Sequence, residues 1–360
     1  MKKYLSRFSR VAFTASVISI IIYVMSIVST EVADFMNSTV SVAVRFFLSL
    51  LSSPFPFSLF ELLIILCPII LVLVIILALR GANDRTEMIR GTVTFVAVLS
   101  LIFTSYIFTL GVGYRTTRLA DRIDLETDSD ISREELYDTV LRVVEGVNTE
   151  ARLLDTDGRT YMPYTKDEMS KKLVRAYDLM NREYSLVTNF TSRVKPVRFS
   201  TVMSDLGITG IYSFFTGESN INVEYPDYTL PFTAAHELAH QRGIAREDEA
   251  NFVAFLVCIY SDDAYIRYSG YLNMYEYLAS ALYRADPDLY GETLELLPPS
   301  AIADIRASDE VYLKHKDSPL GRINERLNDA YLKANGTEGI VSYGYVTRLA
   351  IAYYQKQNNG

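Results

Sequence analysis

Cysteine and histidine are scarce in this chain, whose 360 residues include two cysteines, three histidines and no tryptophan. Two cysteines cannot build a disulfide framework, and they cannot supply the ligands of a cysteine-rich structural zinc site. Cys67 lies in an apolar run and Cys258 in an apolar helical segment, so we expect both to be small core residues. Neither cysteine is predicted to take part in chemistry.

Basic charge is also in short supply. Residues 114–360 contain 27 Lys and Arg against 38 Asp and Glu, which gives this region a net charge of about −11. A nucleic acid is bound by a basic stripe or patch, and anionic lipid headgroups attract the same kind of surface. We therefore expect no nucleic-acid partner, and we expect this region to be a poor peripheral binder of anionic lipid.

Long apolar runs are concentrated in the first third of the chain. Three of them, at about 11–28, 57–79 and 93–112, meet the length of about 20 apolar residues that a helix needs to cross a bilayer. They predict a membrane domain, residues 1–113, that contacts the lipid bilayer through three transmembrane helices. The apolar segment 40–51, between the first two spans, is expected to lie along the outer interface.

Lysine and arginine in the short loops predict the orientation of these helices, because cytoplasmic loops carry an excess of both. The basic residues ahead of the first span are Lys2, Lys3, Arg7 and Arg10, those between the second and third are Arg80, Arg85 and Arg90, and the loop between the first and second has only Arg45. The N-terminus is therefore expected in the cytoplasm. The region after residue 113 is expected outside the plasma membrane.

Helical periodicity dominates the rest of the chain, with one interruption. Capping boxes at Ser132–Glu135 and Thr165–Glu168 predict helices that extend to about residues 151 and 184. Further on, the pattern changes to that of about three short strands, at 197–202, 208–215 and 219–223.

The fold class that these patterns predict is α+β. Three transmembrane helices in residues 1–113 precede a helical region at 114–192 and a mostly helical domain at 193–360, which also holds the small β-sheet. The third region contains all the histidine of the chain.

Two of the three histidines lie in one motif, His236-Glu237-Leu238-Ala239-His240. Residues four apart project from the same face of a helix, so both imidazoles can reach one zinc ion at about 2.0–2.1 Å. Glu237, next to the first ligand, is placed to act as the general base that takes a proton from an activated water. The motif therefore predicts a Zn²⁺ site in which His236 and His240 are ligands and Glu237 is catalytic.

A catalytic zinc ion needs a third protein ligand. Gly243 can end the motif helix in a left-handed turn, and Glu247, Asp248 and Glu249 open the next helix. We predict Glu247 as the ligand, because Asn251 lies one turn further along the same face and can orient it. Glu249 is the alternative, and acidic residues at a helix N-terminus also have a purely electrostatic explanation.

The segment His236–Phe252 resembles the zincin metallopeptidases, and in particular the bacterial membrane family DUF3810. That family is similar in its N-terminal transmembrane helices, in a Gly-Glu-x-Asn segment, here Gly217–Asn220, and in a late Ser-Tyr segment, here Ser342-Tyr343. The likeness covers nearly the whole chain. It implies a zincin-like fold with a glutamate ligand on the helix after the motif, which Glu247 matches, whereas Arg246 stands where metzincins would have a histidine.

Zincin-like folds also imply a strand that pairs with extended substrate. The strand at 219–223 resembles it in position, although an ordinary buried strand fits the pattern equally well. For an oxyanion stabiliser the sequence offers Tyr343, Arg348 and His315. We choose Tyr343, because lysines flank His315 and it is expected to lie in solvent.

We therefore expect a membrane-anchored zinc metallohydrolase with a peptide or protein substrate. Hydrolysis of another bond, such as a cell-wall amide, fits the same motif. The alternative from another class is a non-catalytic envelope protein whose metal site is structural or vestigial and whose tyrosine-rich C-terminal helices bind a partner. Glu237 favours catalysis, because a purely structural site does not require a carboxylate at that position.

Overall fold

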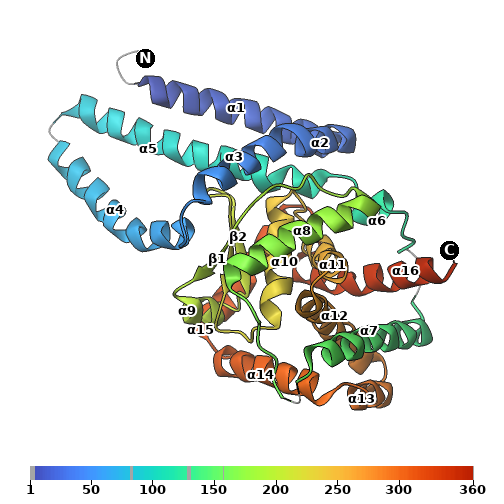
Figure 1. The fold of residues 1–360 in the computed structure, drawn as a ribbon. Coiled ribbons are helices and arrows are strands. Elements are labelled where there is room, and N and C mark those ends of the chain that lie inside the picture. Colours follow the sequence, from blue (N-terminus) through green and yellow to red (C-terminus); the bar gives the residue numbers. More distant parts are fainter. Residues whose placement is uncertain (1–4, 82–83, 128–130, 157, 360) are drawn as a thin grey trace. The chain divides into compact units, whose positions relative to one another are not determined.

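The computed structural model describes residues 5–81, 84–127, 131–156 and 158–359 (Figure 1). Contacts within the chain divide it into two compact units. The membrane unit comprises residues 1–116 and 213–218, and the second unit comprises residues 117–212 and 219–360.

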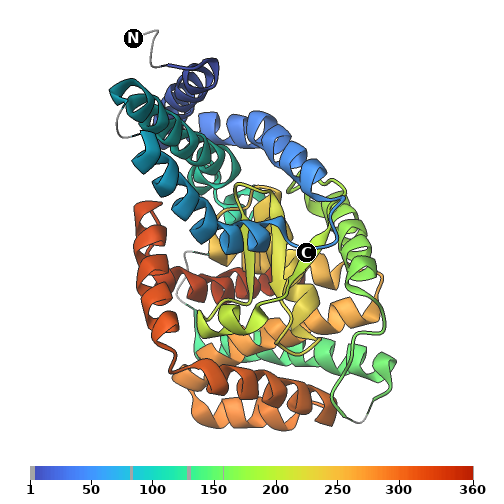
Figure 2. The ribbon, with the colours of Figure 1, turned by 90° about the vertical axis from the view of Figure 1, so that its left-hand side faces the viewer.

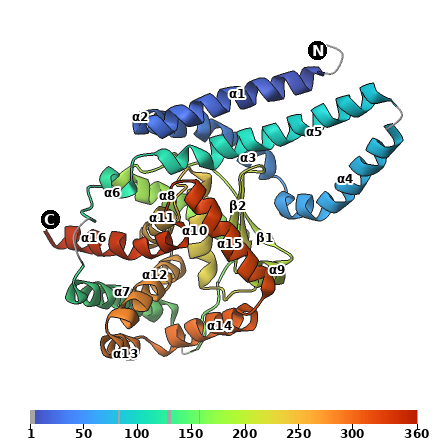
Figure 3. The same ribbon diagram turned by 180° about the vertical axis from the view of Figure 1, so that it is seen from behind.

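The membrane unit is built mainly from helices. Their bounds are α1 Arg7–Val28, α2 Thr30–Met36, the π-helix η1 Asn37–Ser41, α3 Val42–Ser52, α4 Leu59–Gly81, α5 Arg85–Tyr106, the π-helix η2 Ile107–Gly111 and the 3-10 helix η3 Gly113–Arg115. Helices α1 and α5 lie side by side (Figures 1 and 3). The Ser16 hydroxyl donates to the Ser100 carbonyl at 2.8 Å and lies 2.9 Å from Thr104 Oγ1. Small hydroxyl residues of this kind let membrane helices approach closely.

Within the described residues, four segments are long and apolar enough to cross a membrane: Arg7–Val28, Thr30–Ser52, Leu59–Ile76 and Arg85–Arg115. They indicate a membrane protein whose helices contact a lipid bilayer. Three of them correspond to the predicted spans, and Thr30–Ser52 is one more than the sequence predicts. Polar residues interrupt its apolar run, and four of them, Ser41, Arg45, Ser49 and Ser52, are buried. Arg45, for example, is buried and donates to the side-chain and carbonyl oxygens of Asn37 at 2.9 and 2.8 Å.

The segment 213–218 belongs to the membrane unit, although the residues on either side of it do not. The ring of Phe214 packs edge-on against Tyr106, with centroids 5.7 Å apart. The Glu218 carboxylate accepts hydrogen bonds from the backbone N–H groups of the first two residues of α4, at 3.0 and 2.8 Å. A carboxylate at this position satisfies N–H groups that the start of a helix leaves without intrahelical partners.

A three-stranded sheet has the order β1-β3-β2, with β1 Val194–Val197, β2 Gly210–Ser213 and β3 Glu218–Asn222. β1 pairs in parallel with β3, from Val194 opposite Ser219 to Val197 opposite Asn222. β2 and β3 are adjacent strands joined by a short turn, so they run antiparallel. The prediction of a mostly helical α+β chain with a small sheet is confirmed.

One prediction about this sheet is wrong, because the strand predicted at 197–202 is only the end of β1 and the chain then forms the helix α9, Ser200–Asp205. The strand predicted at 219–223 is β3, for which substrate pairing and ordinary burial were both open. It lies in the centre of the sheet with all five of its residues buried. A central strand has partners on both sides and offers no edge to a substrate.

The other helical elements that the structure describes belong to the second unit, and two of them, α10 and α11, carry the predicted site. These elements are α6 Leu119–Arg122, α7 Arg133–Leu154, α8 Lys166–Tyr184, α10 Thr229–Gln241, α11 Glu247–Ile259, α12 Ala264–Ala285, α13 Pro287–Glu295, α14 Pro299–His315, α15 Pro319–Ala334, the 3-10 helix η4 Gly339–Tyr345 and α16 Val346–Asn359, together with α9. The capping boxes predicted at Ser132 and Thr165 are both present, at the starts of α7 and α8.

Helix α11 lies in the centre of the core of the second unit. It contacts α8, α10, α12 and α16 (Figures 1 and 3). A methyl group added at Gly270 on α12 would lie 2.4 Å from the Cβ atom of Cys258, so glycine lets these two helices pack closely. Cys258 is a core residue as predicted, but Cys67 is exposed on α4 and that prediction is wrong. Helix α4 is apolar on all sides, as a membrane span is, and residues 67–76 of it are all exposed, so Cys67 shares the surroundings of its neighbours.

Candidate metal centre

Helix α10 carries both histidines of the motif and is almost wholly buried. His236 and His240 lie one turn apart on it, with ring centroids 4.6 Å apart. The Tyr177 hydroxyl on α8 donates to the Ala235 carbonyl at 2.7 Å and so fixes the helix from outside. A buried, externally held helix keeps two side chains at a constant separation, which a metal centre requires.

Beyond the second histidine the chain turns sharply and continues as α11. Gly243 has a φ of 101°, the left-handed conformation that the sequence predicts there. The turn brings the Ile244 carbonyl within 2.8 Å of His240 Nδ1. Because a carbonyl only accepts hydrogen bonds, Nδ1 carries the proton, and Nε2 is left to face Glu247, the first residue of α11.

Glu247 completes a cluster with the two histidines. Its Oε2 atom lies 3.2 Å from His236 Nε2 and 3.6 Å from His240 Nε2. One ligand atom from each of the three residues lies within 4.8 Å of the other two, so a single cation could contact all three. The three side chains are only 9–14% exposed, so the cluster is mostly shielded from bulk water.

Burial and mutual attraction shift the pKa values of the cluster. Burial by itself would raise the pKa of Glu247, but the two histidines outweigh it and hold that pKa well below its ordinary value. Burial by itself would lower the pKa of His240, but Glu247 outweighs it and raises that pKa to about 9. The lone pairs of the cluster therefore converge on a point that favours positive charge, either protons or a metal cation.

Glu237 lies next to this cluster and is 4% exposed. Its Oε2 atom is buried and has no hydrogen-bond partner in the described part of the chain. Burial raises its pKa to about 6, against the lowering effect of the two histidines. A buried carboxylate with an unused oxygen and a pKa near neutrality is suited to proton transfer.

Strand β2 approaches Glu237 closely. A methyl group added at Gly210 would lie 2.5 Å from Glu237 Oε1 and 2.8 Å from Thr233 Cγ2. A side chain at this point of the sheet would displace the carboxylate, so glycine leaves the room that Glu237 needs.

The alternative ligand, Glu249, has a separate set of partners. Its Oε1 atom accepts hydrogen bonds from the Leu119 N–H at 3.1 Å and from Arg246 at 3.3 Å, and Arg118 lies 3.8 Å away. These contacts join the start of α11 to the start of α6 and account for a buried carboxylate without a metal. Of the two predicted candidates, the structure brings Glu247 to the histidines.

Tyr277, on α12, is a residue that the sequence analysis missed. Its hydroxyl interacts with the side chain of Asn251, and its pKa is raised by burial first and by the charge of Glu247 second. Its ring packs 6.3 Å from that of Phe232 on α10. Asn251, which we predict to orient Glu247, is buried. The chain has 26 tyrosines, so no local pattern could single this one out.

The oxyanion candidates chosen from the sequence have different outcomes. Tyr343 lies in η4, and its side chain falls outside the described part of the structure, so its role stays a prediction. Arg348 is exposed. The prediction that His315 lies in solvent is wrong. Carboxylates distant in sequence enclose it: Nδ1 lies 2.7 Å from Asp205 and Nε2 lies 3.1 Å from Glu224.

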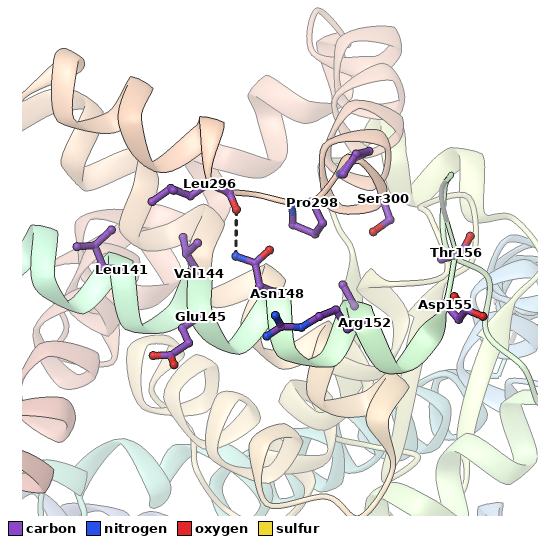
Figure 4. Close-up of a pocket in the computed structure, with 12 residues that line it drawn as sticks. Leu141, Val144, Glu145, Asn148, Arg152, Asp155, Thr156, Leu296, Pro298 and Ser300 are labelled. Atoms are coloured by element: carbon purple, nitrogen blue, oxygen red, sulfur yellow. Dashed lines mark hydrogen bonds between the residues drawn. The ribbon is translucent and has the colours of Figure 1, made fainter.

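A cavity of about 570 Å³ lies elsewhere in the second unit, between α7 and the segment 296–300 (Figure 4). Asn148 borders it and donates to the Leu296 carbonyl at 3.0 Å. Its lining includes none of the residues of the metal centre. We therefore assign this cavity no part in the chemistry of that centre.

Comparison with known proteins gives one match. A family model described as a protein of unknown function (DUF3810) matches residues 37–351. No curated protein and no solved structure matches the chain. The chemistry of the site therefore has to be argued from its own residues.

Proposed function

The chain belongs to the DUF3810 family, whose description records no function, and we propose from its site that it is a membrane-anchored, zinc-dependent metallohydrolase that cleaves peptide bonds. One observation carries this proposal. Three ligand atoms from two helices converge within 4.8 Å, and a buried carboxylate with an unused oxygen lies next to them.

Zn²⁺ fits this donor set. Two imidazole nitrogens and one carboxylate oxygen are the ligands of many catalytic zinc sites, and three protein ligands leave one position open. His240 also has the supporting contact that such ligands usually show, since its other ring nitrogen donates to the Ile244 carbonyl. Bound to His236, His240 and Glu247, zinc would supply a Lewis acid that activates water and polarises the substrate carbonyl.

Two further side chains are assigned roles in this proposal. Glu237 accepts the proton of the attacking water and returns it to the leaving amine nitrogen, using the oxygen that has no partner in the described structure. Tyr277, beside Glu247 and Asn251, offers its hydroxyl to the oxyanion that forms on the substrate. Tyr277 supplements Tyr343 as a candidate for this second role.

Strand β2 supports a peptide as the substrate. It is an edge strand in the described sheet, and Gly210 on it abuts Glu237. An extended peptide that added to this edge by main-chain hydrogen bonds would pass beside the proposed general base. We therefore assign substrate pairing to the edge strand β2 and not to the central strand β3.

The proposal includes an orientation, with the N-terminus in the cytoplasm and the second unit outside the plasma membrane. The short basic loops support it. Only Ser29 separates α1 from α2, whereas antiparallel helices are ordinarily joined by about 2–5 residues. We therefore count Thr30–Ser52 as a segment that does not cross the bilayer, which leaves three crossings.

Protease access to a tag added after Gly360 tests the orientation. In intact spheroplasts, external protease should remove the tag if three segments cross. Protection of the tag in intact spheroplasts, with cleavage after lysis, would place the second unit in the cytoplasm and contradict the proposed orientation.

A peptide-library assay with the full-length chain tests the activity. The zinc-loaded chain should cleave a subset of peptides, and Glu237→Gln should reduce the rate by about 10²–10⁴-fold while it retains the metal. Tyr277→Phe should also retain the metal and lose about 10²–10³-fold. If the chain bound zinc but showed no cleavage that depends on Glu237, the proposal would be contradicted and a structural metal site would be favoured.

A further inference from the structure

Helix α15, Pro319–Ala334, turns its apolar face outward. Leu320, Ile323 and Leu327 lie on one face at helical spacing, and they are 47%, 56% and 65% exposed. Ala330 continues the same face and is also exposed. The helix, orange-red in Figure 2, runs along the outside of the second unit (Figures 2 and 3). An amphipathic helix on a soluble protein normally turns such a face toward the core, so α15 has the opposite orientation.

The side of α15 that packs against the unit is mostly small or polar. The Asn324 amide donates to the Leu206 carbonyl at 3.0 Å, and a methyl group added at Gly321 would lie 3.1 Å from the Asp205 carbonyl oxygen. Leu332 is fully buried. A rotation of α15 that buried the apolar face would break the Asn324 hydrogen bond and expose Leu332, so the outward face is part of the folded arrangement.

Charged and apolar neighbours extend this pattern. Arg322 and Arg326 are exposed along one border of the apolar face. Val341, in the adjoining η4, is 63% exposed. An apolar face bordered by arginines is typical of a helix that lies in a membrane interface. There the aliphatic side chains enter the acyl boundary and the guanidinium groups reach phosphates.

We propose that α15 docks in the interface of a phospholipid bilayer, with its axis in the membrane plane and Leu320, Ile323 and Leu327 below the headgroups. The membrane helices of the same chain hold every copy of α15 near a bilayer, which gives lipid a large advantage in effective concentration over a free protein partner. The acidic charge of residues 114–360 opposes binding to anionic lipid. Docking therefore depends on the apolar face and on the phosphate groups that zwitterionic lipids also carry.

The absence of tryptophan from the chain makes the test direct. Two single-tryptophan variants of the full-length chain, Leu327→Trp on the apolar face and Glu325→Trp on the exposed polar side, are reconstituted in phosphatidylcholine vesicles with and without brominated acyl chains. Bromine quenches a tryptophan that reaches the acyl region. We expect the Leu327→Trp emission to lie at shorter wavelength and to be quenched several-fold more strongly than that of Glu325→Trp. Both positions are exposed, and circular dichroism verifies that each variant folds.

Solvent-like emission and equally weak quenching of both variants would overturn the proposal. Short-wavelength emission from Leu327→Trp without quenching by bromine would overturn it as well, because protein, such as a second copy of the chain, would then cover the apolar face. Metal content plays no part in this readout, so the outcome is independent of the proposed hydrolase activity.

Discussion

Helices α11 and α15 have similar lengths, 13 and 16 residues, and opposite surroundings. Helix α11 has buried residues on every side, and its apolar residues are spread around it. Helix α15 confines its apolar residues to one face and exposes that face. The more strongly periodic helix is thus the more exposed one. Periodicity reports that the two sides of a helix have different surroundings, and in a membrane-anchored chain the apolar side need not face the protein.

The largest expected difference between the two helices is in stability. Leu256→Ala on α11 removes a fully buried side chain and leaves a cavity, so we expect it to lower the free energy of unfolding by about 2–5 kcal/mol. Leu327→Ala on α15 should change it by less than about 0.5 kcal/mol. Denaturant unfolding of the full-length chain in detergent, followed by circular dichroism, measures both. Equal costs would break the comparison, because they would mean that the apolar face of α15 is buried in the folded protein.

The close contact between β2 and helix α10 allows the position of Glu237 to be tested. Gly210→Ala should displace the Glu237 carboxylate and reduce the rate of hydrolysis by up to about 100-fold, with zinc content unchanged. Gly291→Ala is the matched control, since a methyl group there meets nothing within 4 Å. Full activity in Gly210→Ala would show that the position of Glu237 does not limit the reaction.

The two glutamates in the first turn of α11 should have different roles, Glu247 in metal binding and Glu249 in stability. Glu249→Ala leaves the Leu119 N–H and two arginines without their shared acceptor, and we expect it to cost about 1–3 kcal/mol of unfolding free energy. The variant should retain bound metal. If Glu247→Ala were destabilised and Glu249→Ala were not, the structural role would belong to Glu247 and the prediction would be wrong.

The smallest expected effect is on the pH dependence of stability and comes from His315, which contacts α9, the helix against which α15 packs. His315 lies between Asp205 of α9 and Glu224, and Lys314 also pairs with Glu224. The hydrogen bond to Asp205, and then that to Glu224, raises the pKa of His315 above its ordinary value of about 6.5. Its stabilising effect should be complete below about pH 6.5 and should be lost as the pH rises through the higher folded-state pKa.

Unfolding measured at a series of pH values checks this expectation, with His315→Gln as the control. Stability should fall with rising pH above about 6.5 in the unmodified chain, by a small amount that the variant lacks. Parallel curves for the two proteins would contradict the contact between His315 and the two carboxylates.

Local patterns were sufficient for some of these features. Helical spacing places His236 and His240 one turn apart, and the capping boxes at Ser132 and Thr165 begin helices where predicted. Each of these features depends on residues within a few positions of one another. Secondary structure with strong local signals can be predicted from one sequence for that reason.

Other features depend on residues that are distant in sequence. Glu249 differs from Glu247 because it accepts a hydrogen bond from the N–H of Leu119, which lies about 130 positions earlier in the chain. His315 is enclosed by Asp205 and Glu224, and Tyr277 reaches the site from another helix. Strand order likewise depends on tertiary pairing, so β3 could not be placed in the centre of the sheet from its own pattern.

The most direct test of the central claim is the zinc content of the purified full-length chain, measured by elemental analysis beside His240→Ala, Glu247→Ala and Glu249→Ala. The account predicts about one zinc per chain in the unmodified protein and in Glu249→Ala, and almost none in His240→Ala and Glu247→Ala. No stoichiometric metal in the folded unmodified chain would contradict it. So would loss of zinc from Glu249→Ala with retention in Glu247→Ala.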